Sequence, residues 1–392
     1  MNHLILHSEI QEFIYKNLNS DIQLLVLKGF SFPNIENSEV ITQIEAKKRC
    51  KTKLPTWFSA QNIYYPNALN IEQTSSEITA KYKSELINGA SIIDLTGGFG
   101  VDCLYFSKRF KTVRHCEINT KLSEIVNHNY KQLYVNNVET LPTDGIAYLK
   151  GTTATFDWIY IDPSRRHDSK GKVFFLNDCL PNVPEHLNLL FKHSDHILIK
   201  TSPLLDISSG IAELQNVSSI HVVAIHNEVK ELLWVLTKGF LGDTVIKTIN
   251  IKKTAAERFE FVLNDEKNQN ANYSTPLKFL YEPNAAILKA GAFNQVAQQL
   301  PVLKLHKHSH LYTSDTLIDF PGRIFKIKSV VPYSKKALKR LPITRANITT
   351  RNFPETVSQL RQKTKIKDGG DTYLFFTTNV NNSKLILITE KL

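Results

Sequence analysis

The sequence predicts an α/β protein with a mostly parallel, helix-covered sheet, a helical N-terminal region and a small basic α/β domain at the C-terminal end. Three observations lead to this prediction. The 392 residues are enough for two or three domains, each with its own core. Apolar strand-like segments alternate with helical stretches from about Trp57 to Val262, as in sheets that carry helices on both faces. The last third of the chain then becomes strongly basic.

The composition is that of a soluble globular protein, with 42% hydrophobic and 22% charged residues. No segment reaches the roughly 18 to 20 uninterrupted apolar residues of a membrane helix, and the first residues are too interrupted for a secretion signal. We therefore expect a cytoplasmic protein without membrane contact. The cysteines are far apart and form no CxxC pair, so we expect reduced, mostly buried thiols and neither disulfides nor a metal site. They are Cys50, Cys103, Cys116 and Cys179.

Residues 1–55 show helix-like apolar spacing and are predicted to form a helical N-terminal region, whose function the sequence does not indicate. Residues 56–275 contain the predicted strands of the large sheet. The last two strands are separated only by NEVKE, which is too short for a crossover helix, so we expect an antiparallel hairpin at the sheet edge. The predicted strands are Ser91–Leu95, Thr112–Cys116, Asp157–Ile161, His196–Thr201, Ile220–His226 and Leu232–Thr237.

Two smaller segments follow the polar stretch Asn264–Thr275. Residues 276–318 combine the helical pattern YEPNAAILKAGAFNQVAQQL with LKLHKHSHLYTS, which we interpret as a strand. Residues 319–392 contain strand-like GRIFKIKSVV, the basic helix SKKALKRL, strand-like RANITTRN, a helix after Pro354 and two final strands. This last segment is predicted to be a small α/β domain.

All of the excess positive charge lies in the last part of the chain. The net charge is +11, and residues 276–392 carry 19 Lys and Arg against 7 Asp and Glu, whereas residues 1–275 carry 29 against 30. Arg323 to Lys367 alone contain 13 basic residues and one acid, Glu355. Such a distribution favours a surface that binds polyphosphate, and the alternative is a solvated basic face without a partner.

A glycine-rich loop follows the first predicted strand. The segment SIIDLTGGFGVDCLYFSKRF has the pattern of a buried strand, a tight turn and a helix start, with Gly97, Gly98 and Gly100 where the backbone must approach a ligand. A P-loop is excluded because Gly-Lys-Ser/Thr is missing. A dinucleotide is disfavoured because Asp102 would repel a pyrophosphate at the helix start and Cys103 replaces the third glycine.

Carboxylates around this loop favour a cationic ligand without phosphate, S-adenosylmethionine. Asp94 ends the strand and Asp102 begins the helix, so both can face an ammonium or sulfonium group. Glu117 closes the next strand and can accept both ribose hydroxyls, while Asp144 can accept the adenine amino proton. A lone acid at a strand end is usually a helix cap, but the ordered set is specific. The predicted cofactor residues are Asp94, Thr96, Gly97, Gly98, Gly100, Asp102, Glu117, Asp144 and Asp162.

The segment FDWIYIDPSRR places Asp162 and Pro163 at the carboxyl end of the fourth strand, beside the switch point where ligands of open α/β sheets bind. An acid there can hold or deprotonate the group to be methylated. Ser164 and Arg165 complete the predicted catalytic segment. Arg165 and Arg166 can stack on a base or clamp a phosphate, but they can equally be structural ion-pair partners.

With these residues the chain resembles class I methyltransferases that have a C-terminal THUMP-like domain. The resemblance spans about residues 55 to 392. It implies a Rossmann-like seven-stranded domain closed by one reversed strand, a small ferredoxin-like segment and an RNA substrate, because THUMP domains accompany enzymes that modify structured RNA. The motifs that carry it are DLTGGFGVD, EQTSSEITAKYK, DPSRR, IKTSPLLDI, NEVKELLW, EPNAAILKAG and ITTRNFP.

One motif departs from a related pattern. Methyltransferases of exocyclic amines usually carry an aromatic residue after Asp/Asn-Pro-Pro, whereas Ser164 and Arg165 stand at these places, which argues against base N-methylation. Cysteine-dependent carbon methylation needs a thiolate at the site. Cys179 lacks the usual preceding proline and is predicted to belong to the core.

We expect an RNA methyltransferase whose basic C-terminal domain captures rRNA or tRNA. A looped target is favoured because a base must leave its stack to enter such a pocket. The alternatives are a methyltransferase of a protein or small molecule, and a non-catalytic RNA-binding protein with an S-adenosylmethionine-binding scaffold; the oligomeric state stays open. The predicted substrate contacts are Arg166, Lys200, Lys335, Lys336, Lys339, Arg340 and Arg351.

Overall fold

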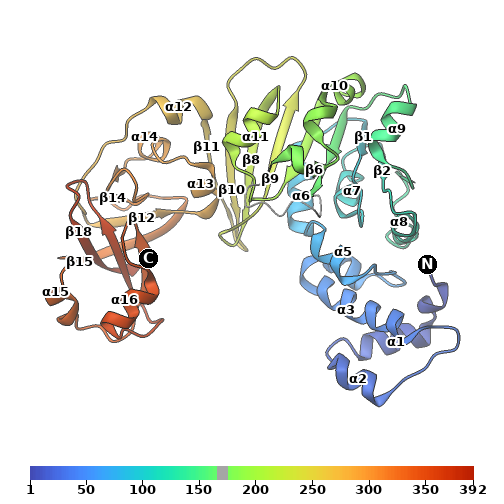
Figure 1. Cartoon of the computed structure of the whole chain (residues 1–392), viewed down its shortest axis with the longest axis horizontal. Helices are drawn as coiled ribbons and strands as arrows, with labels where there is room; N and C mark the ends of the chain where they lie inside the picture. Colours follow the sequence, from blue (N-terminus) through green and yellow to red (C-terminus); the bar gives the residue numbers. More distant parts are fainter. Residues whose placement is uncertain (166–174) are drawn as a thin grey trace. The chain divides into compact units, whose positions relative to one another are not determined.

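The computed structural model of the protein describes residues 1–165 and 175–392 (Figure 1). Within these residues the chain divides into two compact units, and two strands, β8 (Val217–Ile225) and β9 (Glu228–Thr237), contribute residues to both. The units are Met1–Val217 with Trp234–Phe240, and Ser218–Leu233 with Leu241–Leu392.

Helices form the N-terminal region of the first unit, as the apolar spacing predicts. Asp21 caps the second α-helix, because its carboxylate accepts hydrogen bonds from the N–H groups of Gln23 and Leu24. Gln43 exchanges two hydrogen bonds with the backbone of Tyr65, at 2.7 and 2.9 Å, and so fixes these helices to the segment that leads into the sheet. The elements are η1 (His3–Leu6), α1 (Ser8–Lys16), α2 (Ile22–Lys28), α3 (Asn37–Lys53), α4 (Pro55–Ser59), α5 (Ala68–Gln73) and α6 (Glu77–Leu86).

Parallel strands form the centre of the first unit, in the order β7-β4-β1-β2-β3, with the end of β9 beside β7. The inner strands β1, β4 and β7 are almost continuously apolar and buried, as strands covered on both faces must be. The strands predicted here are confirmed. Their bounds are β1 (Ser91–Asp94), β2 (Thr112–Cys116), β3 (Val138–Leu141), β4 (Trp158–Ile161) and β7 (His196–Thr201).

Helices and short strands connect these strands. Two short antiparallel strands, β5 (Ser164–Arg165) and β6 (Cys179–Leu180), lie between β4 and β7 in the chain. Because β5 directly follows the end of β4, it continues the chain from the edge of the sheet at which ligands bind. The helices are α7 (Val101–Phe106), α8 (Thr120–Gln132), α9 (Gly145–Gly151), η2 (Leu176–Asp178), α10 (Val183–His193) and α11 (Ile207–Glu213).

The second unit begins with the predicted hairpin. β8 (Val217–Ile225) and β9 are joined by His226 and Asn227, whose φ angles of 50° and 66° are those of a two-residue type I′ turn. Its predicted position at the sheet edge is wrong. β10 (Val245–Ile251) pairs in parallel with β8, and β11 (Ala256–Val262) pairs antiparallel with β10.

Two strands therefore extend the sheet beyond the seven that the resemblance implies. The physical reason lies in β11, where the buried Phe259 and Phe261 alternate with the exposed Arg258 and Glu260. This period of two is typical of an outer strand with one solvated face. Such a strand lacks the continuous apolar run by which the inner strands are found.

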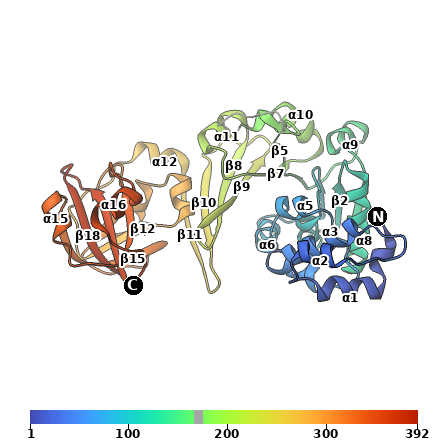
Figure 2. The ribbon, with the colours of Figure 1, turned by 60° about the horizontal axis from the view of Figure 1, so that its bottom comes forward.

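A separate seven-stranded sheet follows in the order β13-β14-β12-β15-β18-β17-β16. Figure 2 shows β12, β15 and β18 side by side in this sheet. The segment LKLHKHSHLYTS, predicted as one strand, forms the two short strands β13 and β14, because it turns back and pairs with itself. The strands are β12 (Phe279–Pro283), β13 (Leu303–Lys304), β14 (Tyr312–Ser314), β15 (Gly322–Pro332), β16 (Asn347–Arg351), β17 (Thr372–Thr378) and β18 (Lys384–Lys391).

Two apolar clusters cover the faces of this sheet. One contains Phe325 and Phe375, and the other contains Leu360 of the helix α16 with Phe376. Phe375 and Phe376 are neighbours in β17 and point to opposite faces, as the period of a strand requires. The helices of the second unit are α12 (Leu263–Asn268), α13 (Ala285–Ala290), α14 (Gln295–Gln299), α15 (Lys335–Lys339) and α16 (Val357–Thr364).

Within the described ranges, no helix has both the length and the apolar character that a membrane crossing requires. All four cysteines lie in the described part of the chain, where they are buried and form no disulfide. Cys179 is 0% exposed, and its thiol lies 3.5 Å from the carbonyl oxygen of Phe175. Its predicted place in the core is thereby confirmed.

Candidate cofactor and active site

The carboxyl ends of β1, β2, β3 and β4 meet at a cavity of about 650 Å³ in the first unit. Parallel strands end at the same edge of a sheet, so loops that are distant in sequence face one another there. None of the residues that line the cavity in the described part of the chain is Lys or Arg. The acidic residues that line it are Asp94, Asp102, Glu117, Asp144 and Asp162.

The glycine loop forms one wall of this cavity, and its glycines are required by close contacts. A Cβ on Gly97 would lie 2.2 Å from Nε2 of His115. Gly100 has a φ of 78°, and a Cβ there would lie 2.3 Å from the hydroxyl of Tyr130. Gly97 and Gly98 line the cavity, whereas Gly100 does not line it and is the N-cap residue of α7.

Thr96 connects two of the predicted acids. Its N–H and hydroxyl both donate to Oδ1 of Asp94, at 2.9 and 3.2 Å, and its hydroxyl accepts from the N–H of Asp162 at 2.7 Å. Asp94 is 1% exposed. Burial raises the pKa of Asp94 to about 7, and the nearby Asp102 adds to this effect, whereas the hydrogen bond from Thr96 opposes it.

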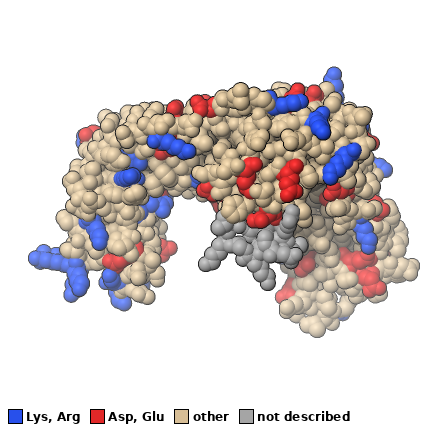
Figure 3. Space-filling view, turned by 45° about the horizontal axis from the view of Figure 1, so that its top comes forward, with Lys and Arg blue, Asp and Glu red and all other residues tan. Residues whose placement is uncertain are grey.

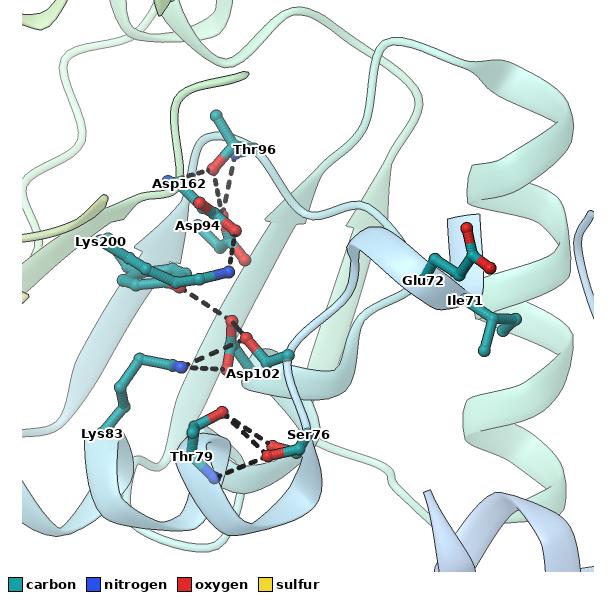
Figure 4. Close-up of polar contacts among 12 residues, drawn as sticks. Ile71, Glu72, Ser76, Thr79, Lys83, Asp94, Thr96, Asp102, Asp162 and Lys200 are labelled. Atoms are coloured by element: carbon teal, nitrogen blue, oxygen red, sulfur yellow. Dashed lines mark hydrogen bonds and ion pairs between the residues drawn. The ribbon is translucent and has the colours of Figure 1, made fainter. Parts of the chain in front are cut away.

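Asp102 lies in a buried polar network that the sequence does not reveal. Its carboxylate accepts from the hydroxyls of Ser75 and Tyr160, both at 2.8 Å, and its Oδ1 lies 3.2 Å from Nζ of Lys83 (Figure 4). Burial opposes its ionisation, but the charges of Lys83 and Lys200 outweigh burial and lower the pKa of Asp102. The carboxylate is therefore ionised beside the cavity.

Lys83, Ser75 and Tyr160 are absent from the predicted set. Lys83 and Ser75 belong to the motif EQTSSEITAKYK, and this motif is the sequence feature by which they could have been found. The serine that caps α6 is Ser76, which accepts from the N–H of Thr79, so Glu77 is the first helical residue and forms no capping box with Thr74. Thr74 and Ser75 are left free of the helix and line the cavity.

Glu117 and Asp144, the two predicted adenosyl contacts, both line the cavity. Glu117 accepts from the N–H groups of Gly98 and Asn119, at 2.9 and 2.7 Å, which orients its carboxylate at the end of β2. Asp144 is exposed and caps α9, because it accepts from the N–H of Ala147 at 2.7 Å. Asp144 thus caps a helix and lines the cavity with the same side chain.

The predicted catalytic segment brings Asp162 and Lys200 together. Nζ of Lys200, at the end of β7, forms an ion pair with Oδ2 of Asp162, and their side chains are 12% and 33% exposed. Pro163 is buried, and Ser164 is exposed and lines the cavity. Arg165 belongs to β5, and Arg166 lies outside the described residues.

The other predicted substrate contacts belong to the second unit. The basic side chains of α15 and that of Arg340 are exposed and form no ion pair with another described residue. Figure 3 shows Lys and Arg side chains at the lower left of the molecule, where α15 lies. Arg351 is bound by Glu282 at 2.8 Å and is 37% exposed. Lys335, Lys336, Lys339 and Arg340 therefore form the free part of this predicted surface.

His115 is a further residue that the sequence does not single out. It is 0% exposed, and neither ring nitrogen has a hydrogen-bond partner among the residues that the structure describes. Burial lowers the pKa of His115 to about 4, so the ring is uncharged and packs against the backbone of Gly97. Across residues 1–165 and 175–392, no group of three or more His, Cys, Asp or Glu side chains could hold a metal ion.

Comparisons with known proteins agree with this arrangement. A family model of a ferredoxin-like domain matches residues 279–321, and a model described as THUMP domain-like matches residues 322–391. An uncharacterized RNA methyltransferase of Mycoplasma mobile is 31% identical over 130 residues, which are 32% of this chain and 35% of that protein. The match thus spans about a third of the length of this curated relative.

A full-length likeness comes from a solved structure. The crystal structure of a putative methyltransferase from Porphyromonas gingivalis W83 matches with a TM-score of 0.89 and 33% sequence identity, over 100% of this chain and 98% of that chain. This match covers the sheet with the cavity as well as the two C-terminal segments. The chain therefore belongs to the class I methyltransferase family in which a ferredoxin-like and a THUMP-like domain follow the methyltransferase domain.

Proposed function

We propose that the protein transfers a methyl group from S-adenosylmethionine to RNA. The observation that carries this proposal is the cavity at the carboxyl ends of four neighbouring strands, which is lined by carboxylates and by the glycine loop. Its lining combines the predicted cofactor residues with Asp162 and Ser164 of the predicted catalytic segment. Cofactor and acceptor can therefore meet in one space.

The residues present fit this cofactor better than a phosphate-bearing one. The cavity carries several acids and no lining Lys or Arg among the described residues, so it attracts an ammonium or sulfonium group and repels a diphosphate. Asp94 and Asp102 would face the methionyl ammonium, and Glu117 would hold the ribose hydroxyls. The exposed Ile118, next to Glu117, offers an apolar surface for the adenine, and Asp144 would accept from its amino group.

Residues of the chain itself would position the acceptor. When bound, S-adenosylmethionine supplies an electrophilic methyl group. Thr96 holds the backbone of Asp162, and Lys200 holds its carboxylate, so this acid is fixed at the cavity wall. A fixed acid can orient the nucleophilic group of the substrate or accept its proton.

RNA as the substrate is supported by the second unit. The C-terminal segment is strongly basic, and it matches the THUMP-like model. The curated relative is itself named an RNA methyltransferase. The free cations of α15 and Arg340 provide the phosphate contacts that a sequence-independent RNA complex needs.

The test is transfer of radiolabelled methyl from S-adenosylmethionine to undermethylated total RNA by the full-length protein. We expect label in an RNA band, loss of that label in Asp162→Ala, and unchanged activity in Asp371→Ala, a control with an exposed acid of the second unit. Calorimetric titration with the cofactor checks that Asp162→Ala still binds it. Label in a protein extract but not in RNA would show that the substrate is a protein. Cofactor binding without label in any extract would contradict the proposed enzymatic activity and favour a non-catalytic, cofactor-binding scaffold.

A further inference from the structure

Three motifs of the chain meet in the second unit, although the methyl-transfer site does not use them. Asn227 begins NEVKELLW, Glu282 and Asn284 belong to EPNAAILKAG, and Arg351 belongs to ITTRNFP. Asn227 accepts from the N–H of Ala285 at 2.8 Å, which links the first two motifs. Glu282 binds Arg351, which links the second and third.

A network of buried amides surrounds this meeting point. Asn250, 1% exposed, accepts from the N–H of Asn227 and donates to Glu257, both at 2.8 Å. Asn284, 2% exposed, also donates to Glu257, at 3.0 Å. Lys252 forms an ion pair with the other oxygen of Glu257. The carboxylate of Glu257 is thus fully used within the network and adds little negative potential to its surroundings.

A cavity of about 430 Å³ lies over this network, and cations dominate its wall. It is lined by Lys252, Lys253, Arg323 and Lys391, and Glu257 is the only carboxylate among its described lining residues. The side chains of Lys253 and Lys391 are exposed and form no ion pair or hydrogen bond with another described residue. Their ammonium groups are therefore available to an anion.

A guanidinium group is held in place at the same wall. Glu282 is 3% exposed and accepts from Nε of Arg323 at 2.6 Å, while it also binds Arg351. Two guanidinium groups around one carboxylate leave a net positive charge. Gly322 also lines this wall, where its backbone packs closely against the neighbouring strand β12. A Cβ at this position would lie 2.1 Å from the carbonyl oxygen of Glu282.

We propose that this cavity is a second RNA-binding site, which holds a phosphodiester group of the strand between Lys253, Lys391 and Arg323. Lysines act on phosphate as mobile point charges, and an arginine fixed by a carboxylate presents its remaining N–H groups in a defined direction. RNA as the source of the phosphate rests on the proposed function. The site itself rests on the cavity and its free cations.

Protection of lysines from acetylation tests the site directly. The full-length protein is treated with an amine-specific acetylating reagent, alone and with unfractionated tRNA, uridine 5′-monophosphate or polyglutamate, and peptide mass spectrometry reads each lysine. We expect tRNA to protect Lys253 and Lys391, and the nucleotide and polyglutamate to leave them reactive. Lys335 and Lys336 of α15 report general RNA binding, and the exposed Lys247, which does not line the cavity, is the control.

Each other outcome overturns the proposal and identifies the fault. Protection of the α15 lysines by tRNA with Lys253 and Lys391 unprotected removes this site and leaves RNA binding intact. Equal protection by the nucleotide makes the cavity a mononucleotide site, and equal protection by polyglutamate makes it a site for an acidic peptide. If tRNA protects no lysine, the RNA part of the proposed function fails together with this site.

A pair of variants adds an energetic measurement. Lys253→Ala combined with Lys391→Ala removes both free cations, and Lys247→Ala combined with Lys278→Ala removes two exposed lysines that do not line the cavity. We expect the first pair to reduce the slope of log K against log salt for tRNA by about 0.7 for each phosphate that is no longer neutralised. The control pair should reduce this slope less than the first pair does. Equal slopes for the two pairs would contradict the proposal.

Discussion

Nζ of Lys83 lies 3.2 Å from Oδ1 of Asp102, and the lysine side chain is 0% exposed beneath the proposed cofactor cavity. Ser75 accepts from the same ammonium group at 3.2 Å and donates to Asp102, so the three side chains form a closed buried network. A buried ion pair tolerates the loss of one partner badly, because the remaining charge stays without compensation. The charge state of the cavity wall thus depends on a residue of α6.

Replacing Lys83 by Met should destabilise the fold. We expect Lys83→Met to lower the free energy of unfolding by about 3 to 5 kcal/mol, because the buried Asp102 loses its cation. Lys81→Met, in the same helix but 68% exposed, should change it by less than about 1 kcal/mol. Urea titration measures both, and Lys83→Met combined with Asp102→Asn should recover part of the loss. A single variant as stable as the wild type would show that the pair contributes little.

Binding of S-adenosylmethionine should strengthen as the pH rises. Asp94 is protonated below its pKa of about 7 and charged above it, and only the carboxylate attracts the methionyl ammonium. We expect the affinity to grow about eightfold from pH 6 to pH 7.5, in proportion to the ionised fraction. Calorimetric titration measures it, and Asp94→Asn should bind weakly with little pH dependence. A flat profile in the wild type would place the ammonium elsewhere.

A methyl group on Gly97 should displace the glycine loop that forms one wall of the cofactor cavity. We expect Gly97→Ala to weaken cofactor binding and to cost about 1 to 3 kcal/mol of stability, because its Cβ would overlap the ring of the buried His115. Gly151→Ala is the matched control, since nothing lies within 4 Å of a Cβ at that position. Thermal unfolding with and without cofactor separates the two effects. Cofactor affinity unchanged in Gly97→Ala would remove this loop from the binding site.

Lys200 should act as a positioning residue for Asp162. We expect Lys200→Met to lower kcat by about a hundredfold, because the carboxylate loses the cation that orients it. The dissociation constant of the cofactor should change little, and Lys200→Arg should recover part of kcat. Equal loss of cofactor binding and of kcat would assign Lys200 a structural role instead.

The sequence determines much of the first unit because the relevant signals are local. Continuous apolar runs identify β1, β4 and β7, and the glycines identify the turn after β1. Parallel strands end at a common edge, so acids placed directly after them converge without further information. Asp94, Glu117 and Asp162 line one cavity for this reason. The charge of the C-terminal segment is likewise a property of composition alone.

Only the tertiary structure decides the partners of the buried polar groups. A lysine is expected at the surface, yet Lys83 is buried against Asp102, because α6 packs on α7. Asn250 and Asn284 belong to distant segments and share Glu257 only after β10, β11 and β12 have formed. Periodicity reports which face of an element is apolar, whereas the packing of one element on another decides which polar atoms meet.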